Sequence, residues 1–258
     1  MSVLKSWSEL QKMHRACTIV VETLEALAQA AGPGVTTREL DRLAHDRIVG
    51  AGARPAFLGY RGYPATLCIS VNEEVVHGIP GPRRLRAGDV VGLDLGCIVD
   101  GFYGDAARTV GVGEVSAEAA RLMRVTEEAL RAAIAQCRPR QRLGDLGWAV
   151  QRHAESQGYS VVREFVGHGI GTSLHEEPQV PNYGPPGRRE RLVAGMTLAI
   201  EPMLNVGGPE VKVLDDGWTA VTRDGSLSAH FELTVAVTEH GPWVLSEPYP
   251  YGQAELRA

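Results

Sequence analysis

Lysine is scarce in this sequence of 258 residues: it occurs only at positions 5, 12 and 212, and arginine supplies nearly all other positive charge. The formal net charge is −5, so the chain lacks the basic field that would attract nucleic acid. No apolar stretch approaches the roughly 20 residues that span a bilayer, and TIVV before Glu22 is too short for the core of a signal peptide. We therefore expect a cytoplasmic protein with neither a nucleic acid nor a membrane partner.

Cysteine is also rare. The four cysteines lie far apart and form no Cys-x-x-Cys pair: Cys17, Cys68, Cys97 and Cys137. This pattern is typical of reduced thiols in a reducing compartment and argues against a structural zinc site. A chain of this length, 44% apolar, can bury a sizeable core without disulfides.

Apolar periodicity predicts the order helices, strands, helices, strands, an α+β chain. The expected elements are a helix capped by Ser8-x-x-Gln11 that ends before Gly32, a helix from the capping box Thr36-x-x-Glu39 to Gly50 or Gly52, strands over 66–112, helices over 116–137 and 143–157, and mainly strands from Tyr159 onward. The pair Asp224-Gly225 predicts a hairpin between WTAVT and HFELTVAV.

Three acidic residues interrupt apolar runs that have the pattern of strands: Asp94 in VVGLDLG, Glu201 in MTLAIEPM and Glu232 in HFELTVAV. Alternation puts Asp94 opposite Leu93 and Leu95, and Glu232 opposite Leu233. Burying an ionised carboxylate costs several kcal/mol by rough estimate unless a positive group compensates it. Arginine could compensate these acids, but few arginines are near them in sequence, so they suggest a bound cation.

Two further residues fit such a site. Asp105 in YGDAA, taken alone, is more typical of a turn. His168 in VGHGIGTSLHEEP is either a histidine of a glycine-rich turn or a metal ligand on a loop that allows close approach. Four carboxylates in one cleft would repel each other, whereas two divalent cations would neutralise them.

The donor set predicts the metal class and the reaction class. Oxygen-rich ligands with one imidazole and no thiolate suit Mn, Fe(II), Co or Zn. Two such ions can hold a bridging water or hydroxide and polarise a carbonyl, which points to hydrolysis.

A weak internal repeat suggests that the chain has two halves that face one cleft. HGI occurs at His77 and again at His168. After each, an AG pair is followed six residues beyond its Gly by an acid, Asp94 in the first case and Glu201 in the second. We place the halves at about 1–113 and 114–258 of a single domain, 1–258.

The motifs resemble those of the type I methionine aminopeptidases over nearly the whole chain. The matching segments are SVNEEVVHGIP, DGFYGDAART, GHGIG, HEEPQVPNYG, GMTLAIEPM and DGWTAVTRDGSLSAHFELTVAVTE. The resemblance implies the pita-bread fold, two pseudo-symmetric αβ halves around a dinuclear metal centre. It also implies metal-dependent removal of the N-terminal methionine from nascent proteins and peptides with a small second residue, by a monomer in transient contact with the ribosome.

The resemblance assigns roles residue by residue. Asp94 would chelate one metal, Asp105 and Glu232 would bridge both, and His168 and Glu201 would bind the other. Glu201 would also relay protons, His175 would contact the scissile carbonyl, and His77 would lie near the new amine. The substrate pocket would be lined by Phe57, Tyr60, Tyr63, Cys68, His77, His175 and Trp218.

Two departures and two alternatives stay open. Leu174 stands where some members have Phe, and His230 where Gln is common. The nearest alternative is an X-Pro aminopeptidase or prolidase, which shares the ligand pattern and usually carries an extra N-terminal domain. The other is a pita-bread binding protein without catalysis, which the intact ligands oppose.

Overall fold

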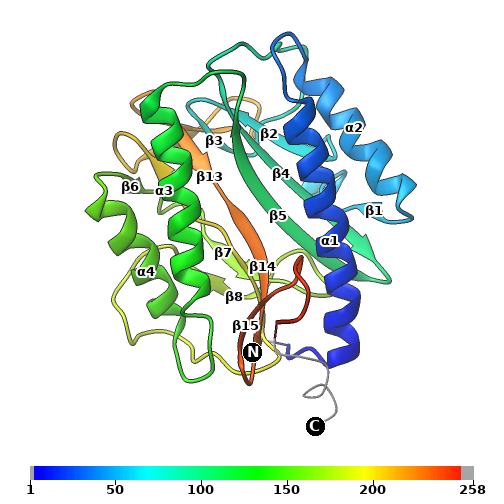
Figure 1. Cartoon of the computed structure of the whole chain (residues 1–258), viewed down its shortest axis with the longest axis vertical. Helices are drawn as coiled ribbons and strands as arrows, with labels where there is room; N and C mark the ends of the chain where they lie inside the picture. The colour runs from blue at the N-terminus through cyan, green and yellow to red at the C-terminus, as the bar shows by residue number, and fades with distance from the viewer. Residues whose placement is uncertain (1–2, 251–258) are drawn as a thin grey trace.

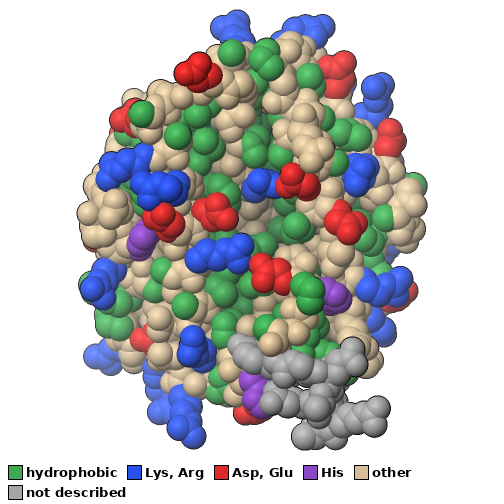
Figure 2. Space-filling model, in the orientation of Figure 1, with side chains coloured by type: hydrophobic (Ala, Val, Ile, Leu, Met, Phe, Trp, Pro, Cys, Tyr) green, Lys and Arg blue, Asp and Glu red, His purple; other side chains and the backbone are tan. Residues whose placement is uncertain are grey.

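Four helices and a curved sheet make up most of the computed structural model, which describes residues 3–250. The helices are α1 (Trp7–Ala30), α2 (Thr37–Gly50), α3 (Ala117–Ile134) and α4 (Leu143–Ser156), with a short 3-10 turn at Tyr60–Gly62. Figure 1 shows α3 and α1 in front of the sheet, with β14 and β5 visible between them. Acidic, basic and apolar side chains are interspersed on this face (Figure 2), so it has no field of one sign.

The longest strands of the chain lie in the interior of the main sheet. The strands are β1 (Arg54–Pro55), β2 (Leu67–Val71), β3 (Glu74–Val76), β4 (Val90–Val99), β5 (Phe102–Gly111), β6 (Ser160–Val161), β7 (Gly167–Gly169), β8 (Glu176–Val180), β9 (Thr197–Ile200), β10 (Met203–Asn205), β11 (Val211–Val213), β12 (Ala220–Thr222), β13 (Ser228–His230), β14 (Glu232–Thr238) and β15 (Gly241–Val244). The main sheet has the order β1-β4-β5-β14-β9-β7-β8, with β2 beside β4 and β15 beside β14.

The expected order of helices and strands is confirmed, but the start of α1 is shifted. Its capping box is formed by Ser6 and Glu9: Ser6 N and Oγ lie 2.7 and 2.8 Å from Glu9 Oε2. Ser8 already lies inside the helix, so Ser8-x-x-Gln11 is not the cap. The box at the start of α2 is confirmed by bonds of 2.7 and 3.2 Å between Thr36 and Glu39.

The hairpin prediction at Asp224-Gly225 is wrong in its pairing. The turn exists, with Gly225 at φ +78°, and the Asp224 carboxylate accepts bonds from Gly208 N and Ser226 N at 2.8 and 3.0 Å. The strands on either side diverge: β12 pairs with β3 and β11, whereas β13 pairs with β10. The run HFELTVAV is also interrupted at Phe231, between β13 and β14. Side-chain bonds therefore hold this turn without a ladder across it.

Apolar residues of the strands pack toward the helices in two clusters. One joins α1 and α2 to β2, β4 and β5 and contains Leu93 and Leu95. The other joins α3 and α4 to β9 and β14 and contains Val235 and Val237. The predicted alternation is confirmed, because Leu93 and Leu95 pack in the first cluster whereas Asp94 between them lines a cavity on the other face. Glu232 lines the same cavity, and Val235 and Val237 pack in the second cluster. Within residues 3–250, no helix is both long and apolar enough to cross a bilayer.

Candidate metal centre

Three strands set carboxylates on the sheet face that points away from the helices. In the β4–β5 pair Asp94 lies opposite Ala107, and in the β5–β14 pair Ala107 lies opposite Glu232. Directly opposed residues point to the same face of a sheet, and so does Asp105, two positions before Ala107. The tight turn at Asp100 and Gly101, with φ of 50° and 82°, fixes the register of β4 against β5.

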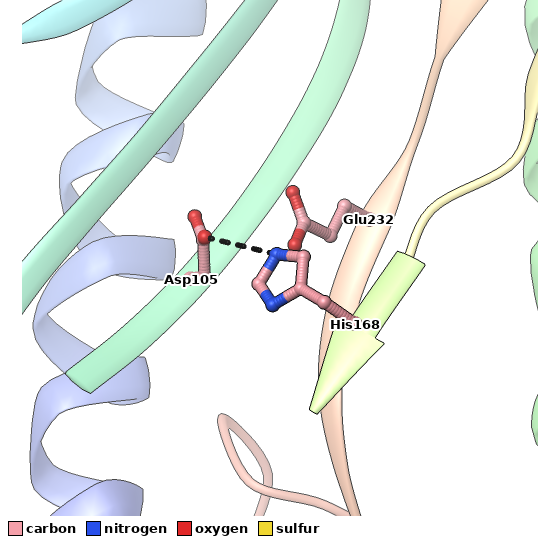
Figure 3. Close-up of side chains that lie close together, drawn as sticks. All are labelled: Asp105, His168 and Glu232. Carbon is pink, nitrogen blue, oxygen red and sulfur yellow. Dashed lines mark ion pairs between the residues drawn. The ribbon is translucent and has the colours of Figure 1, made fainter. Parts of the chain in front are cut away.

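The second half of the sheet adds an imidazole and a fourth carboxyl. Glu201 directly follows β9, which pairs with β14, and His168 lies on β7, which pairs with β9. His168 Nε2 lies 3.5 Å from Glu201 Oε1 and 4.0 Å from Asp105 Oδ2. Figure 3 shows the imidazole beside the carboxyls of Asp105 and Glu232, and one donor atom from each of these three residues lies within 4.8 Å of the others.

The carboxyl oxygens have the properties of cation ligands. Among the described residues, Asp94 Oδ1, Asp105 Oδ1 and Glu232 Oε1 are buried without a hydrogen-bond partner. Burial raises the pKa of Asp94 to about 7. Burial, and then the charge of Asp94, raise the pKa of Asp105, while burial and the neighbouring acids raise those of Glu201 and Glu232. Divalent cations would provide the missing partners and charge, so these residues fit a metal centre.

His168 is held as a ligand would be. Its Nδ1 lies 2.9 Å from the carbonyl oxygen of Gly169, to which it donates, so the neutral ring presents the Nε2 lone pair to the carboxyls. Burial lowers the pKa of His168 to about 3, which keeps it neutral. Only glycine fits in β7 directly before and after His168, because a Cβ at Gly167 or Gly169 would lie 2.3 Å from a carbonyl oxygen of a neighbouring strand.

The four carboxyls and His168 share a cavity of about 150 Å³ with every residue of the predicted pocket. Its lining consists of Phe57, Tyr60, Arg61, Tyr63, Cys68, His77, Asp94, Asp105, His168, Leu174, His175, Glu201, Trp218 and Glu232. The structure therefore brings all the sequence-predicted site residues together.

Arg61 lines the cavity although the sequence patterns do not predict it as a site residue. It lies between the two pocket tyrosines in YRGY, adopts φ 50°, and places its guanidinium 5.4 Å from the centre of the Tyr60 ring. A basic residue held between two pocket aromatics was the available signal. Its positive charge adds to burial in lowering the pKa of His175, with burial the larger cause.

His77 and His175 approach the metal centre from opposite halves of the chain. The His175 ring lies 4.1 Å from that of His168, centre to centre, and its Nδ1 is 2.9 Å from the Tyr60 hydroxyl. His77 has φ 62°, an unusual conformation for a non-glycine residue. Burial lowers its pKa to about 4, so it is neutral near pH 7.

Buried carboxyls and a neutral imidazole at a cavity define a hydrolase-type metal centre. The chain belongs to metallopeptidase family M24, whose model matches residues 11–239.

Relatives match over nearly the full chain. A methionine aminopeptidase from Clostridium perfringens is 52% identical, covering 95% of this chain and 99% of its own. The crystal structure of the methionine aminopeptidase from Thermotoga maritima superposes with a TM-score of 0.95 at 45% identity, covering 96% of this chain and 100% of its own. The prolidase from Pyrococcus furiosus, 22% identical, shares the fold with a TM-score of 0.77, covering 96% of this chain and 66% of its own. The predicted pita-bread fold is confirmed.

Proposed function

We propose that this chain is a methionyl aminopeptidase, which removes the N-terminal methionine from nascent proteins and peptides whose second residue is small. The observation that carries the proposal is the joint cavity, in which the metal-centre residues share one small space with an apolar side-chain pocket. The full-length relatives named methionine aminopeptidase support the same reaction.

Two divalent cations would be held by five residues, with Asp94 chelating one, Asp105 and Glu232 bridging both, and His168 and Glu201 binding the other. The negative charges of four carboxylates balance the charge of two divalent cations. The mixture of oxygen and imidazole donors suits Co, Mn, Fe(II) or Zn. When bound, such ions supply Lewis-acid polarisation of a carbonyl and a hydrolytic nucleophile at neutral pH.

Glu201 would move the proton. Burial and two neighbouring acids raise its pKa, so its carboxyl can take a proton from the attacking water and give it to the departing amine. His168 Nε2 lies 3.5 Å from Glu201 Oε1, close enough for the two residues to bind the same cation.

His175 would stabilise the charge that develops on the scissile carbonyl. If the Tyr60 hydroxyl donates to Nδ1 across the observed 2.9 Å, the proton of the neutral ring resides on Nε2, which becomes a donor for the carbonyl oxygen. His77, held neutral by burial, would accept a hydrogen bond from the substrate amine.

The side-chain pocket suits methionine. Phe57, Tyr63 and Cys68 are buried, with Trp218 packed edge-on against Tyr63 at 5.1 Å between ring centres. Tyr63 is fixed by hydrogen bonds of 2.8 and 3.1 Å from its hydroxyl to Gly78 O and Leu67 O. A rigid wall of aromatic and sulfur surface favours the flexible thioether.

The other assignments belong to the same proposal. The chain would act as a single catalytic domain, 1–258, with halves at about 1–113 and 114–258, as the two helix-packed clusters suggest. A monomer in the cytoplasm with transient access to the ribosome would meet nascent chains as they emerge.

The test is release of free amino acid from Met-Ala-Ser and from Ala-Pro-Ser, each with chelator and with added Mn(II) or Co(II). Metal-dependent release of methionine alone is expected. Cleavage of Ala-Pro-Ser alone would transfer the chain to the X-Pro peptidases, and no release from either peptide under any condition would favour the binding-protein alternative.

A further inference from the structure

Lys5, one of three lysines in the chain, has a buried ammonium group. Its side chain is only 2% exposed, and Nζ lies 2.6 Å from Glu176 Oε2, itself on a side chain that is 12% exposed. Nζ also donates to Val3 O at 2.9 Å. A lysine is almost never buried in this way unless it is paired, and the pair joins the N-terminal segment to the other half of the chain.

The partner, Glu176, organises the loop that carries His175. Its second oxygen, Oε1, accepts backbone N–H bonds from Thr172 at 2.8 Å and Ser173 at 3.2 Å. The loop 171–176 is therefore wrapped around one carboxylate, and His175 is the residue directly before it. The ammonium of Lys5 compensates the charge of that carboxylate where water has little access.

The backbone near Lys5 is anchored as well. Lys5 N donates to Gly195 O at 2.7 Å, and Tyr103 N donates to Gly171 O at 2.8 Å. The lysine stem crosses Gly171 so closely that a Cβ there would lie 2.2 Å from Lys5 Cε. The stem and the loop thus share a fixed contact, and a shift of one would move the other.

The contacts of the His175 ring act on the ring and not on the backbone of this residue. His175 is exposed as a residue, and its ring contacts are His168 at 4.1 Å and Tyr60, stacked at 5.4 Å between ring centres with its hydroxyl 2.9 Å from Nδ1. Neither ring fixes the backbone of residue 175. That restraint comes from the loop, and the loop is organised by Glu176.

We propose that Lys5 is a positioning residue, whose buried ion pair with Glu176 holds the loop 171–176 so that His175 stays over the metal centre. The expected effect of Lys5 on turnover rests on the proposed function. The restraint that Lys5 places on the loop does not, because it can be measured without turnover. Removing the charge should loosen the loop and lower kcat through His175, with little effect on the distant donors Asp94 and Glu232.

The variant to make is Lys5→Met, which keeps the stem and removes the charge. Lys12→Met is the matched control, because Lys12 lies over the Phe102 ring at 5.2 Å and has no bond to the loop. With Mn(II) or Co(II) present, we expect hydrogen exchange over 171–176 to rise about tenfold or more in Lys5→Met and to remain at the wild-type rate in the control. Unchanged exchange over this segment in Lys5→Met would overturn the proposal, whether or not the wild type releases methionine.

Turnover tests the link to His175. On Met-Ala-Ser, well below the melting temperature of each variant, we expect Lys5→Met to lower kcat about tenfold with KM changed less than about threefold. In a His175→Ala background the same substitution should have no further effect, because it acts through the missing ring. An equal loss of kcat in both backgrounds would indicate a merely structural role and reject the assignment.

Glu176→Gln provides a second route if Lys5→Met does not fold. The amide keeps an acceptor for Thr172 and Ser173 but breaks the ion pair. As in Lys5→Met, hydrogen exchange over 171–176 should rise and kcat should fall. Wild-type exchange and kcat in a folded Glu176→Gln would contradict the proposal. Absence of turnover in the wild type would instead count against the proposed function, and the exchange result would still decide whether Lys5 holds the loop.

Discussion

His230 Nε2 lies 3.7 Å from Glu201 Oε2, on the side of that carboxyl opposite to His168. Both backbone groups of His230 are bonded to Thr109 Oγ1, at 2.9 Å for its N and 2.8 Å for its O. Its ring is buried, and Nε2 has no hydrogen-bond partner in the described part of the chain. Burial lowers its pKa to about 3. The Glu201 carboxyl, which we propose moves the proton, is thus flanked by two neutral imidazoles.

Replacing His230 tests whether this second imidazole orients Glu201. In His230→Gln, the residue common in the resembled family, the amide keeps a polar group beside Glu201 Oε2, and we expect kcat within about threefold of wild type. In His230→Leu an apolar side chain replaces the polar ring 3.7 Å from that oxygen. This raises the cost of charging the Glu201 carboxyl, so kcat should fall about tenfold or more. Steady-state rates on Met-Ala-Ser measure both, and equal rates in His230→Leu and wild type would remove His230 from the site's function.

Glu201→Gln separates proton transfer from metal binding. The amide has nearly the same shape and leaves Asp94, Asp105 and Glu232 in place, so we expect the fold and at least one bound metal ion to persist. The amide cannot accept and return a proton, so kcat should fall by about 10² to 10⁴. Turnover, circular dichroism and metal titration should be measured on the same sample. Near-native turnover would take Glu201 out of the proton path.

Much of the site could be predicted from local sequence because strands impose a period of two. Asp94 and Glu232 each interrupt an apolar run, and that alternation already put them on the face away from the core. The position of the two in one row could not be predicted from pattern alone, since it depends on the register between β4, β5 and β14. That register is a contact between strands far apart in sequence.

Other features were out of reach for physical reasons. The sequence does not distinguish Ser6 from Ser8 as the cap of α1, because both begin an S-x-x-E/Q pattern and only the bonds from Ser6 to Glu9 decide between them. The Asp-Gly pair at 224–225 predicts a hairpin that does not form, because the side-chain bonds of Asp224 to Gly208 and Ser226 cannot be predicted from the sequence. The Lys5 to Glu176 pair spans 171 residues, and no local pattern announces it.

Asp94→Asn should stabilise the metal-free protein while weakening its response to metal. Asp94 has its pKa raised to about 7 by burial and repels Asp105 and Glu201. A neutral amide removes that repulsion, so we expect the melting temperature without metal to rise by a few degrees and the increase on adding Mn(II) to shrink by at least half. Asp46→Asn, at an exposed acid of α2, is the control. An unchanged or lower melting temperature of metal-free Asp94→Asn would contradict the charge argument.

The metal-free protein should lose stability through its carboxyls as pH rises. The pKa values of these carboxyls are raised in the folded state. Their contribution to the free energy of unfolding is therefore fully present below the unfolded pKa, which is about 4 for Asp and Glu. It is lost as pH rises through the folded values, about 7 for Asp94. The buried histidines act in the opposite direction: His168, with its pKa lowered to about 3, favours the folded state above its unfolded value of about 6.5. The pH dependence of the melting temperature without metal therefore combines a loss from the carboxyls with a gain from the histidines.

The difference in melting temperature between metal-loaded and metal-free protein separates these effects. To bind a cation the carboxyls and His168 must all be deprotonated, so rising pH both strengthens binding and increases the repulsion that the metal relieves. With Mn(II) at about 100 times its Kd, stabilisation is about 2.7 kcal/mol, or roughly 5–11 °C for a chain of this size. We expect a gap of that size at pH 8 that shrinks toward zero by pH 5, with net proton release on metal binding in calorimetry across buffers of different ionisation enthalpy. The exposed-acid variant Glu239→Gln should keep the wild-type gap. A gap independent of pH, or larger at pH 5, would mean that the cation does not bind at these carboxyls.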